Sequence, residues 1–282
     1  MLYENKTYDE ERAFYALKNA TVRNCKFDGP ADGESAFKEC QNIIIEDSYF
    51  NLRYPFWHVD GVKINGCEFT ESCRAALWYD KDVEIDNCKM HGIKALRECR
   101  NVTLTNSDIS SAEYAWRTYG IIIKNTTLSG EYSFFENKDM EIDGLQMKGK
   151  YSFQYVENAI IRNSVLDTKD AFWHAKNVVI EDSVIKGEYL AWYAENIKFV
   201  RCKLIGTQPL CYCKGLVLED CTMEGCDLSF ERSEVEAKVK GYIDSVKNPI
   251  CGHICADSIG KIILEEDIVT LGACEIEILD AE

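Results

Sequence analysis

Indole, imidazole, guanidinium and carboxylate side chains gather at two adjacent positions of a pattern that repeats along the chain. The first position holds Arg97 and all five tryptophans, namely Trp57, Trp78, Trp116, Trp173 and Trp192. The second position, one residue later, holds Glu39, His58, Tyr79, Glu98, Arg117, Glu136, Tyr155, His174 and Tyr193. Aromatic rings suit the apolar faces of sugars, while carboxylates and arginine hydrogen-bond sugar hydroxyl groups. These residue types therefore predict a carbohydrate ligand along one strip.

Five charged residues of this strip are the candidates for catalysis. Glu98, Arg117 and Glu136 stand in consecutive repeats, so each carboxylate is one strand spacing, about 4.8 Å, from the guanidinium. His58 follows Glu39 by one repeat, and a contact between the two would orient the imidazole for proton transfer. If the chain is an enzyme, these groups indicate a carbohydrate-active hydrolase, lyase or isomerase. The alternative is that the stacked side chains only fix the register of neighbouring strands.

The other strip residues are candidates for binding a ligand. Arg97 lies one repeat from both Trp78 and Trp116, which permits a cation–π stack. His174 has a tyrosine one repeat away on either side, a pattern that favours a stacked structural histidine over a base. The full set of ligand-binding candidates is Trp57, Trp78, Tyr79, Arg97, Trp116, Tyr155, Trp173, His174, Trp192 and Tyr193.

A period of 19 residues organises the chain. We number each repeat from one reference residue, its anchor, which is Asn177 in the repeat of Val178 and Ile180. Apolar residues such as these two stand one and three residues after the anchor, with mostly polar residues between them. That alternation is the period of a strand with one buried face. Two more apolar columns, eight after and five before the anchor, indicate three short strands per repeat. With two insertions, the anchors are Asn19, Asn42, Gly61, Asp82, Asn101, Gly120, Asp139, Asn158, Asn177, Asn196, Gly215 and Glu234.

This pattern predicts an all-β fold: a single-stranded right-handed parallel β-helix of about twelve rungs of 19 residues, with a terminal β cap. We expect a single domain over residues 1–282, with an N-terminal cap at 1–13, regular rungs at 14–230 and C-terminal capping strands at 231–282. Simple alternation points the tryptophan column outward and the following column inward. Because a row of buried glutamates is costly, we expect a bend that brings both columns to one groove.

Small residues recur at two further positions. Six residues after the anchor stand mostly cysteine, serine and threonine, such as Cys67 and Ser107, which predicts an internal ladder beside a tight bend. Ten residues after it glycine recurs, and we expect a turn with positive φ there. The glycines are Gly130, Gly149, Gly187, Gly206 and Gly225.

The composition restricts the classes of partner that the chain is expected to bind and the cellular compartment in which it is expected. A net charge of −16 argues against nucleic-acid binding, and no apolar run approaches the roughly 20 residues of a membrane span. The first residues lack a basic region followed by an apolar one, so we expect no signal peptide and a cytoplasmic protein. The 14 cysteines are scattered, which predicts free thiols. Neither Cys211-x-Cys213 nor Cys251-x3-Cys255 has a paired Cys-x2-Cys, so we predict no metal and no cofactor.

Several segments resemble domain-of-unknown-function family 3737, nearly end to end. They are DGESAFKE (32–39), YPFWH (54–58), RAALWYD (74–80), DAFWHAKNV (170–178), GEYLAWYAEN (187–196), GYIDSVKNPI (241–250) and DSIGKII (257–263). The resemblance implies a right-handed β-helix of the pectin-lyase-like class in bacterial proteins without secretion signals. It implies no activity. The calcium-site aspartates with an arginine base of pectate lyases, and the paired aspartates of the β-helix hydrolases, are absent from this sequence, so fold analogy does not license those reactions.

Two functional hypotheses follow. The first is a protein that binds or acts on a carbohydrate through the tryptophans and the carboxylates around Arg117. The second is a non-catalytic scaffold whose aromatic strip meets another chain, such as a second copy in a homo-oligomer. The adjacent Glu181 and Asp182 are interpreted as solvated outer positions, because Glu46 and Asp47 fill the same places in their repeat.

Overall fold

Parallel β-strands stacked turn upon turn make up the structure, a computed structural model that describes residues 1–279. No helix occurs in that range, and two compact units are distinguished, residues 1–146 and 147–279. The all-β parallel β-helix predicted from the sequence is confirmed, with a spacing of about 19 residues. The predicted rung count is too low, because about 15 turns replace the expected twelve.

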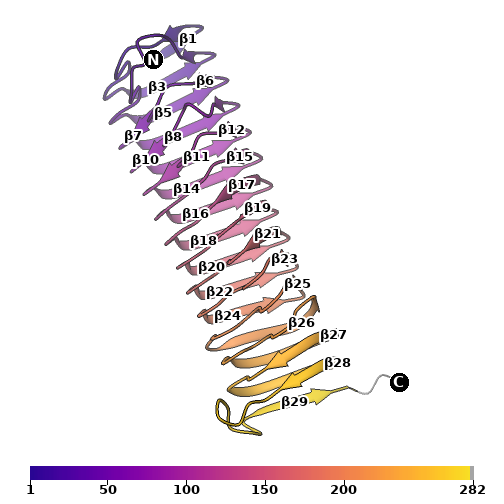
Figure 1. The fold of residues 1–282 in the computed structure, drawn as a ribbon. Coiled ribbons are helices and arrows are strands. Elements are labelled where there is room, and N and C mark those ends of the chain that lie inside the picture. Colours follow the sequence, from indigo (N-terminus) through magenta and orange to yellow (C-terminus); the bar gives the residue numbers. More distant parts are fainter. Residues whose placement is uncertain (280–282) are drawn as a thin grey trace. The chain divides into compact units, whose positions relative to one another are not determined.

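In the first unit each complete turn contributes a first strand, six residues long except for β1, and a short second strand, and three turns add a third strand (Figure 1). The first series is β1 (Leu2–Glu4), β3 (Lys18–Arg23), β5 (Gln41–Glu46), β8 (Asp60–Asn65), β11 (Lys81–Asp86), β14 (Arg100–Thr105), β16 (Tyr119–Lys124) and β18 (Lys138–Asp143). The second is β2 (Thr7–Tyr8), β4 (Lys26–Phe27), β6 (Tyr49–Phe50), β9 (Glu68–Phe69), β12 (Lys89–Met90), β15 (Asp108–Ser110) and β17 (Thr127–Glu131). The third is β7 (Phe56–Trp57), β10 (Leu77–Trp78) and β13 (Leu96–Arg97).

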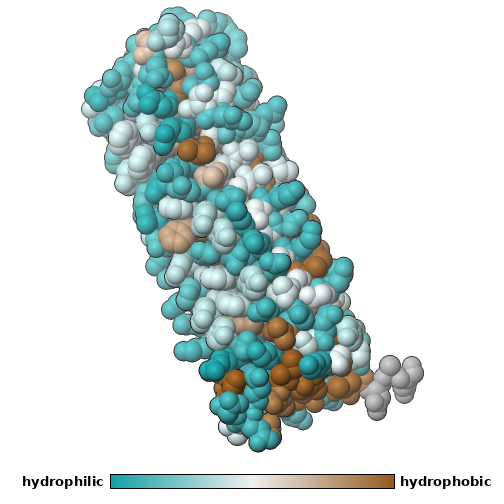
Figure 2. Space-filling model, viewed as in Figure 1, coloured by the Kyte–Doolittle hydropathy of each residue, from teal (hydrophilic) through white to brown (hydrophobic). Residues whose placement is uncertain are grey.

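The second unit repeats this arrangement and ends in longer strands. β19 (Gln146–Lys150) spans the boundary between the units. The first series of the second unit is β20 (Glu157–Arg162), β22 (Lys176–Glu181), β24 (Glu195–Val200), β26 (Leu216–Glu224), β27 (Glu234–Lys247), β28 (Cys251–Ile263) and β29 (Cys274–Ile278). The short strands are β21 (Val165–Lys169), β23 (Val184–Lys186) and β25 (Lys203–Ile205). Apolar side chains gather on the surface around its last strands (Figure 2).

The rung count differs from the prediction because the end turns lack the apolar pattern of the middle ones. β1 and β2 lie within residues 1–13, yet they pair in parallel with β3 and β4. β28 and β29 continue the parallel stack beyond β27, whose Glu234 is the last of the predicted anchors. Backbone hydrogen bonds define a turn whatever its side chains, so a count based on apolar columns misses such turns.

The predicted apolar columns form the interior. Phe27, Phe50 and Phe69 are buried and stack with ring centroids 4.7 Å apart, one ring per turn. Strands β11 and β14 pair with Val83 beside Val102 and Ile85 beside Leu104, so like side chains stand over one another. Register and burial therefore follow from the same two-residue alternation.

Positive φ angles explain the anchor residues. Asn101 adopts φ 53° and Gly120 φ 69°, and Asn106, five residues after its anchor, adopts φ 50°. Asn, Asp and Gly are the residue types that tolerate this left-handed region best. The prediction of positive φ for the glycines ten residues after the anchor is confirmed only in part. Gly206 has φ 128°, whereas Gly130 lacks a positive φ and is required because a Cβ there would meet the Ser111 carbonyl oxygen at 2.0 Å.

Candidate functional site

A corner in the backbone turns both predicted columns to the outer surface. The second column has left-handed φ in every turn of the first unit that carries a candidate, including His58 at 57°, Glu98 at 55° and Arg117 at 51°. A left-handed residue breaks the alternation of a strand, so adjacent side chains no longer point to opposite faces. Half-buried Trp57 and exposed Tyr79 accordingly share one surface. We call these two columns in the first unit the corner strip: Glu39, Trp57, His58, Trp78, Tyr79, Arg97, Glu98, Trp116, Arg117 and Glu136.

The first column of the corner strip is a continuous stack of rings and cations. Lys38 Nζ lies 4.9 Å from the Trp57 ring, and Trp57 stacks on Trp78 at 5.8 Å with 11° between the planes. The Arg97 guanidinium lies 5.8 Å from the Trp78 ring and 4.8 Å from the Trp116 ring. The cation–π stack predicted for Arg97 is therefore present. Because ring faces cover one another in this stack, its outer surface consists of ring edges.

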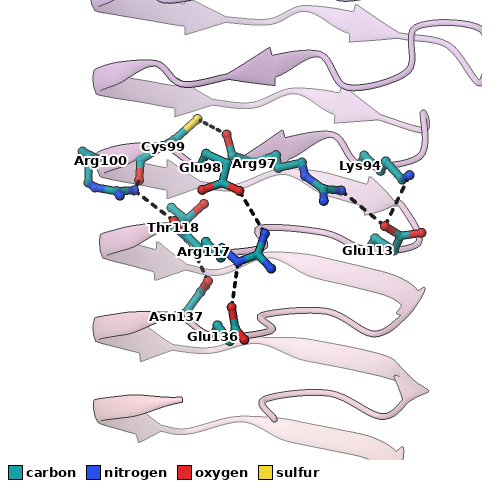
Figure 3. A network of polar contacts seen from close by, with 10 residues as sticks. All are labelled: Lys94, Arg97, Glu98, Cys99, Arg100, Glu113, Arg117, Thr118, Glu136 and Asn137. Atoms are coloured by element: carbon teal, nitrogen blue, oxygen red, sulfur yellow. Dashed lines mark hydrogen bonds and ion pairs between the residues drawn. The ribbon is translucent and has the colours of Figure 1, made fainter. Parts of the chain in front are cut away.

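An ion triplet occupies the second column beside this stack. Arg117 Nε donates to Glu136 Oε2 at 2.7 Å, and its Nη1 donates to Glu98 Oε1 at 3.1 Å. Figure 3 shows the Arg117 guanidinium pointing between the two carboxylates, with Arg97 reaching separately to Glu113. Hydrogen bonds to Glu136 and then Glu98 raise the pKa of Arg117 above its ordinary value. The triplet is therefore a fixed array of donors and acceptors on neighbouring turns.

The structure does not bring Glu39 onto the imidazole of His58. The Glu39 carboxylate accepts a hydrogen bond from Tyr15 Oη at 2.7 Å, and this bond raises the pKa of Tyr15. The His58 ring stacks instead on Tyr79, with centroids 5.0 Å apart and 7° between the planes. Among residues 1–279, no hydrogen bond or ion pair joins His58 to a carboxylate. His58 thus lacks the partner that a proton-transfer role would require.

The candidates of the second unit form two ring stacks of their own. Tyr155, His174 and Tyr193 lie face to face, with centroids 4.9 and 5.1 Å apart, as the sequence indicated for His174. Trp173 stacks on Trp192 at 5.6 Å. Each of these indoles donates its Nε1 hydrogen to a backbone carbonyl of the next turn, Trp173 to Tyr189 and Trp192 to Gln208. Rings held in this way serve as register-setting ladders.

Sequence reasoning missed a deeply buried carboxyl group, that of Asp80. Asp80 is 1% exposed and its Oδ1 accepts from the Val59 backbone N–H at 2.7 Å. Burial raises the pKa of this carboxyl well above 3.8. The repeat holds the signal that would have placed it, because Asp80 lies two residues before its anchor, in the same column as Cys99 and Asn137. Both of those residues are also fully buried.

A shallow depression lies elsewhere in the first unit, on the outer face of β5, β8, β11 and β14. Its volume is about 430 Å³, and two of its lining residues, Lys63 and Glu84, form an ion pair at 2.9 Å. Residues 1–279 contain no group of three or more His, Cys, Asp or Glu side chains arranged to hold a metal ion. They also contain no helix that could span a membrane.

Comparison with known proteins gives one family and several distant structures. The family described as "Protein of unknown function (DUF3737)" matches residues 1–277, and no curated protein matches the chain in sequence. The surface adhesin PfbA of Streptococcus pneumoniae is 9% identical, with 80% of this chain and 73% of that chain covered and a TM-score of 0.42. The A-module of the mannuronan C-5 epimerase AlgE4 of Azotobacter vinelandii is 9% identical over 98% and 87% of the chains, with a TM-score of 0.34. At these values neither likeness assigns an activity.

Proposed function

This chain belongs to the DUF3737 family of proteins of unknown function, and we propose that its corner strip binds a carbohydrate chain without cleaving it. The observation that carries the proposal is the Glu98–Arg117–Glu136 triplet beside the Trp78–Arg97–Trp116 stack. Sugars present many hydroxyl groups, each of which both donates and accepts, and a mixed row of guanidinium and carboxylate groups complements them. Ring edges and half-buried aromatic surface alongside supply apolar contact.

The order of the triplet favours binding. Each charged side chain is already held by its neighbour at 2.7 or 3.1 Å, on turns whose backbones are hydrogen-bonded to one another. A ligand that meets such an array has less side-chain freedom to remove when it binds.

The same contacts argue against acid–base cleavage by Glu98 and Glu136. Glycoside hydrolysis places two carboxyl groups about 5–9.5 Å apart across the scissile bond, one protonated and one ionised. Here the Arg117 guanidinium stands between the two carboxylates and forms an ion pair with each of them. The place that a scissile bond would need between the two groups is therefore filled.

Replacing the central arginine tests the proposal. We expect Arg117→Gln to weaken binding of any oligosaccharide found on a broad glycan array by about tenfold, because charge-assisted hydrogen bonds are lost. Isothermal titration calorimetry on the array hit measures this change. The matched control is Arg162→Gln, which removes an outer arginine with the same Nε to Glu181 Oε2 contact of 2.7 Å in the second unit. Equal losses in both variants, or an array without a hit, contradict the proposal. Release of shortened oligosaccharides contradicts its non-catalytic part.

A second function is favoured by the exposed tyrosines. Tyr79 is 44% exposed in the first unit, and Tyr193 is 43% exposed in the second. Exposed aromatic rings of this kind are frequent in protein interfaces, so the corner strip around Tyr79 also suits a second copy of the chain. The mass in solution separates the two functions: a dimer that Tyr79→Ser converts to a monomer supports the interface, whereas a monomeric wild type leaves the carbohydrate proposal.

A further inference from the structure

The last strand of the second unit has one open edge. β29 pairs in parallel with β28, from Gly252 beside Cys274 to Ala256 beside Ile278. On its other edge, no strand formed by residues 1–279 pairs with it, and Figure 1 shows β29 as the final strand of the stack. An open edge presents backbone donors and acceptors to any extended segment that approaches.

The backbone groups at this edge can be assigned. The Leu279 N–H donates to the Ala256 carbonyl at 2.9 Å, so Leu279 faces β28. The backbone N–H and C=O groups of successive residues in a parallel strand point to opposite edges. Those of Glu275 and Glu277 therefore also point toward β28. The backbone N–H and C=O groups of Ile276 and Ile278 therefore point to the open edge.

The side chains of β29 alternate between an apolar and an acidic face. Ile276 stands beside fully buried Ile254, so the isoleucines continue the interior face of the turn below them. That face is uncovered at this end, since Ile278 is 47% exposed. Glu275 and Glu277 lie on the outer face, where Glu277 Oε2 is 3.2 Å from His253 Nε2.

The apolar surface extends beyond the strand itself. Ile262, Leu264 and Leu271 are each at least 40% exposed, and they belong to the end of β28 and the connection that leads to β29. Figure 2 shows hydrophobic side chains gathered at this end of the second unit. A segment laid along the open edge would cover part of this surface.

Charge decides which segment fits. Residues 264–279 hold five acidic side chains, Glu265, Glu266, Asp267, Glu275 and Glu277, and no lysine or arginine. If a second copy paired through the same edge, any register with isoleucines inside would place glutamate beside glutamate, which is unfavourable. Residues 1–13 hold four acidic and two basic side chains, so the first turn of another copy is also a poor match.

We propose that the open edge of β29 binds an extended segment of another protein in which apolar and basic residues alternate. The segment adds one more strand by hydrogen bonding to Ile276 and Ile278. Its apolar side chains cover the isoleucines on the interior face, and its lysines or arginines meet Glu275 and Glu277 on the outer face. This interaction is independent of the corner strip.

A synthetic peptide of alternating isoleucine and lysine is the probe, titrated onto the full chain with fluorescence anisotropy as the readout. We expect it to bind, and a peptide of alternating isoleucine and glutamate to bind at least about tenfold more weakly. Ile276→Pro removes the outward N–H and no hydrogen bond to β28, and proline is tolerated on an edge strand. We expect this variant to unfold at the wild-type temperature and to lose about tenfold in affinity for the lysine peptide.

Charge reversal supplies the specificity test. Glu275→Lys with Glu277→Lys should exchange the preference, so that the glutamate peptide binds better than the lysine peptide. The matched control is Glu234→Lys with Glu236→Lys on β27, which makes the same charge change on a strand paired along both edges with β26 and β28. We expect the control to keep the wild-type preference.

Three results would overturn the inference: equal binding of the two peptides, lysine-peptide binding that Ile276→Pro leaves unchanged, and loss of preference in the β27 control. A wild-type dimer that Ile276→Pro converts to a monomer would also overturn it, since the edge would then serve a second copy.

Discussion

Asp80 is the residue whose environment differs most from what its type suggests. Its carboxyl group is enclosed within the first unit, where Oδ1 accepts from Val59 N–H and Oδ2 has no partner among residues 1–279. An ionised carboxylate there would be desolvated without a cation, so burial raises its pKa well above 3.8. The folded chain therefore holds Asp80 protonated under conditions in which the unfolded chain ionises it.

This difference predicts a pH-dependent stability. Below about pH 4 both states are protonated at Asp80; as the pH rises, ionisation of the unfolded state lowers the free energy of unfolding. We expect Asp80→Asn to remove this loss and to raise the free energy of unfolding at pH 8 by about 1–3 kcal/mol. Urea denaturation of both proteins at pH 4.5, 6 and 8 measures it.

Asn137 provides the internal standard for this substitution. It fills the equivalent position three turns further on, and its Oδ1 accepts from the Thr118 backbone N–H at 2.9 Å, as Asp80 does from Val59. An asparagine is therefore compatible with the site. If the wild-type and Asp80→Asn stabilities differ by the same amount at all three pH values, Asp80 is not protonated in the fold.

At the scale of the element, the predicted ladder of small residues is present in the first unit. The backbone N–H groups of Cys25 and Cys88 donate to Ser48 Oγ and Ser107 Oγ at 3.1 Å, and the N–H of Ser48 donates to Cys67 Sγ at 3.4 Å. These side chains are buried immediately after the left-handed bend. Each turn thus uses the side chain of the next turn to satisfy a backbone group that the bend leaves without a strand partner.

Cys67 gives the test of this ladder. Cys67→Ala removes the acceptor for the Ser48 N–H, and we expect it to lower the free energy of unfolding by about 1 kcal/mol or more. Cys67→Ser keeps an acceptor of the kind that Ser48 and Ser107 supply in the same column, and we expect a smaller loss. Thermal unfolding of the two variants compares them. If both lose equally, sulfur packing outweighs the hydrogen bond.

The corner strip and the ladder of small residues contribute differently to stability. Its ion triplet lies half-buried at the surface, where water reaches each pair and limits its contribution to stability. The ladder of small residues lies inside, where an unsatisfied backbone group is costly. The ladder of small residues therefore matters more for stability than the ion triplet does, although both belong to columns that repeat every 19 residues.

For the whole molecule, the cysteines divide by burial. All 14 are free, and eleven are buried, whereas Cys251, Cys255 and Cys274 in β28 and β29 are partly exposed. Burial raises the pKa of Cys40 to about 11 and that of Cys226 to about 12. Cys40 and Cys226 consequently carry little of the nucleophilic thiolate, and burial closes all eleven thiols to reagents.

We therefore expect three thiols of the folded chain to react with iodoacetamide first, those of Cys251, Cys255 and Cys274. The buried thiols should react at least about a hundredfold more slowly, because a reagent reaches them only when the β-helix opens locally. Mass spectrometry of digested, time-resolved samples identifies the sites, and the chain in guanidinium chloride is the control. Early labelling of Cys67 or Cys99 would contradict the burial of these columns.

Local patterns in the sequence are sufficient to predict the β-helix, its period and most of its interior. Alternation, the Asn, Asp and Gly anchors and the phenylalanine columns are local signals that recur in each turn, so repetition reinforces them. The end turns escaped this reasoning because backbone pairing, not an apolar pattern, holds them in the stack.

Which side chains contact one another could not be predicted from the repeat and follows from the folded chain. The cost of burying glutamates predicts a bend, but Glu, His, Tyr and Arg do not mark a left-handed residue by type, and the φ angles place the bend at the second column. Glu39 contacts Tyr15 rather than His58, and Asp80 lies inside. Side-chain direction and burial depend on contacts between turns, which spacing alone does not specify.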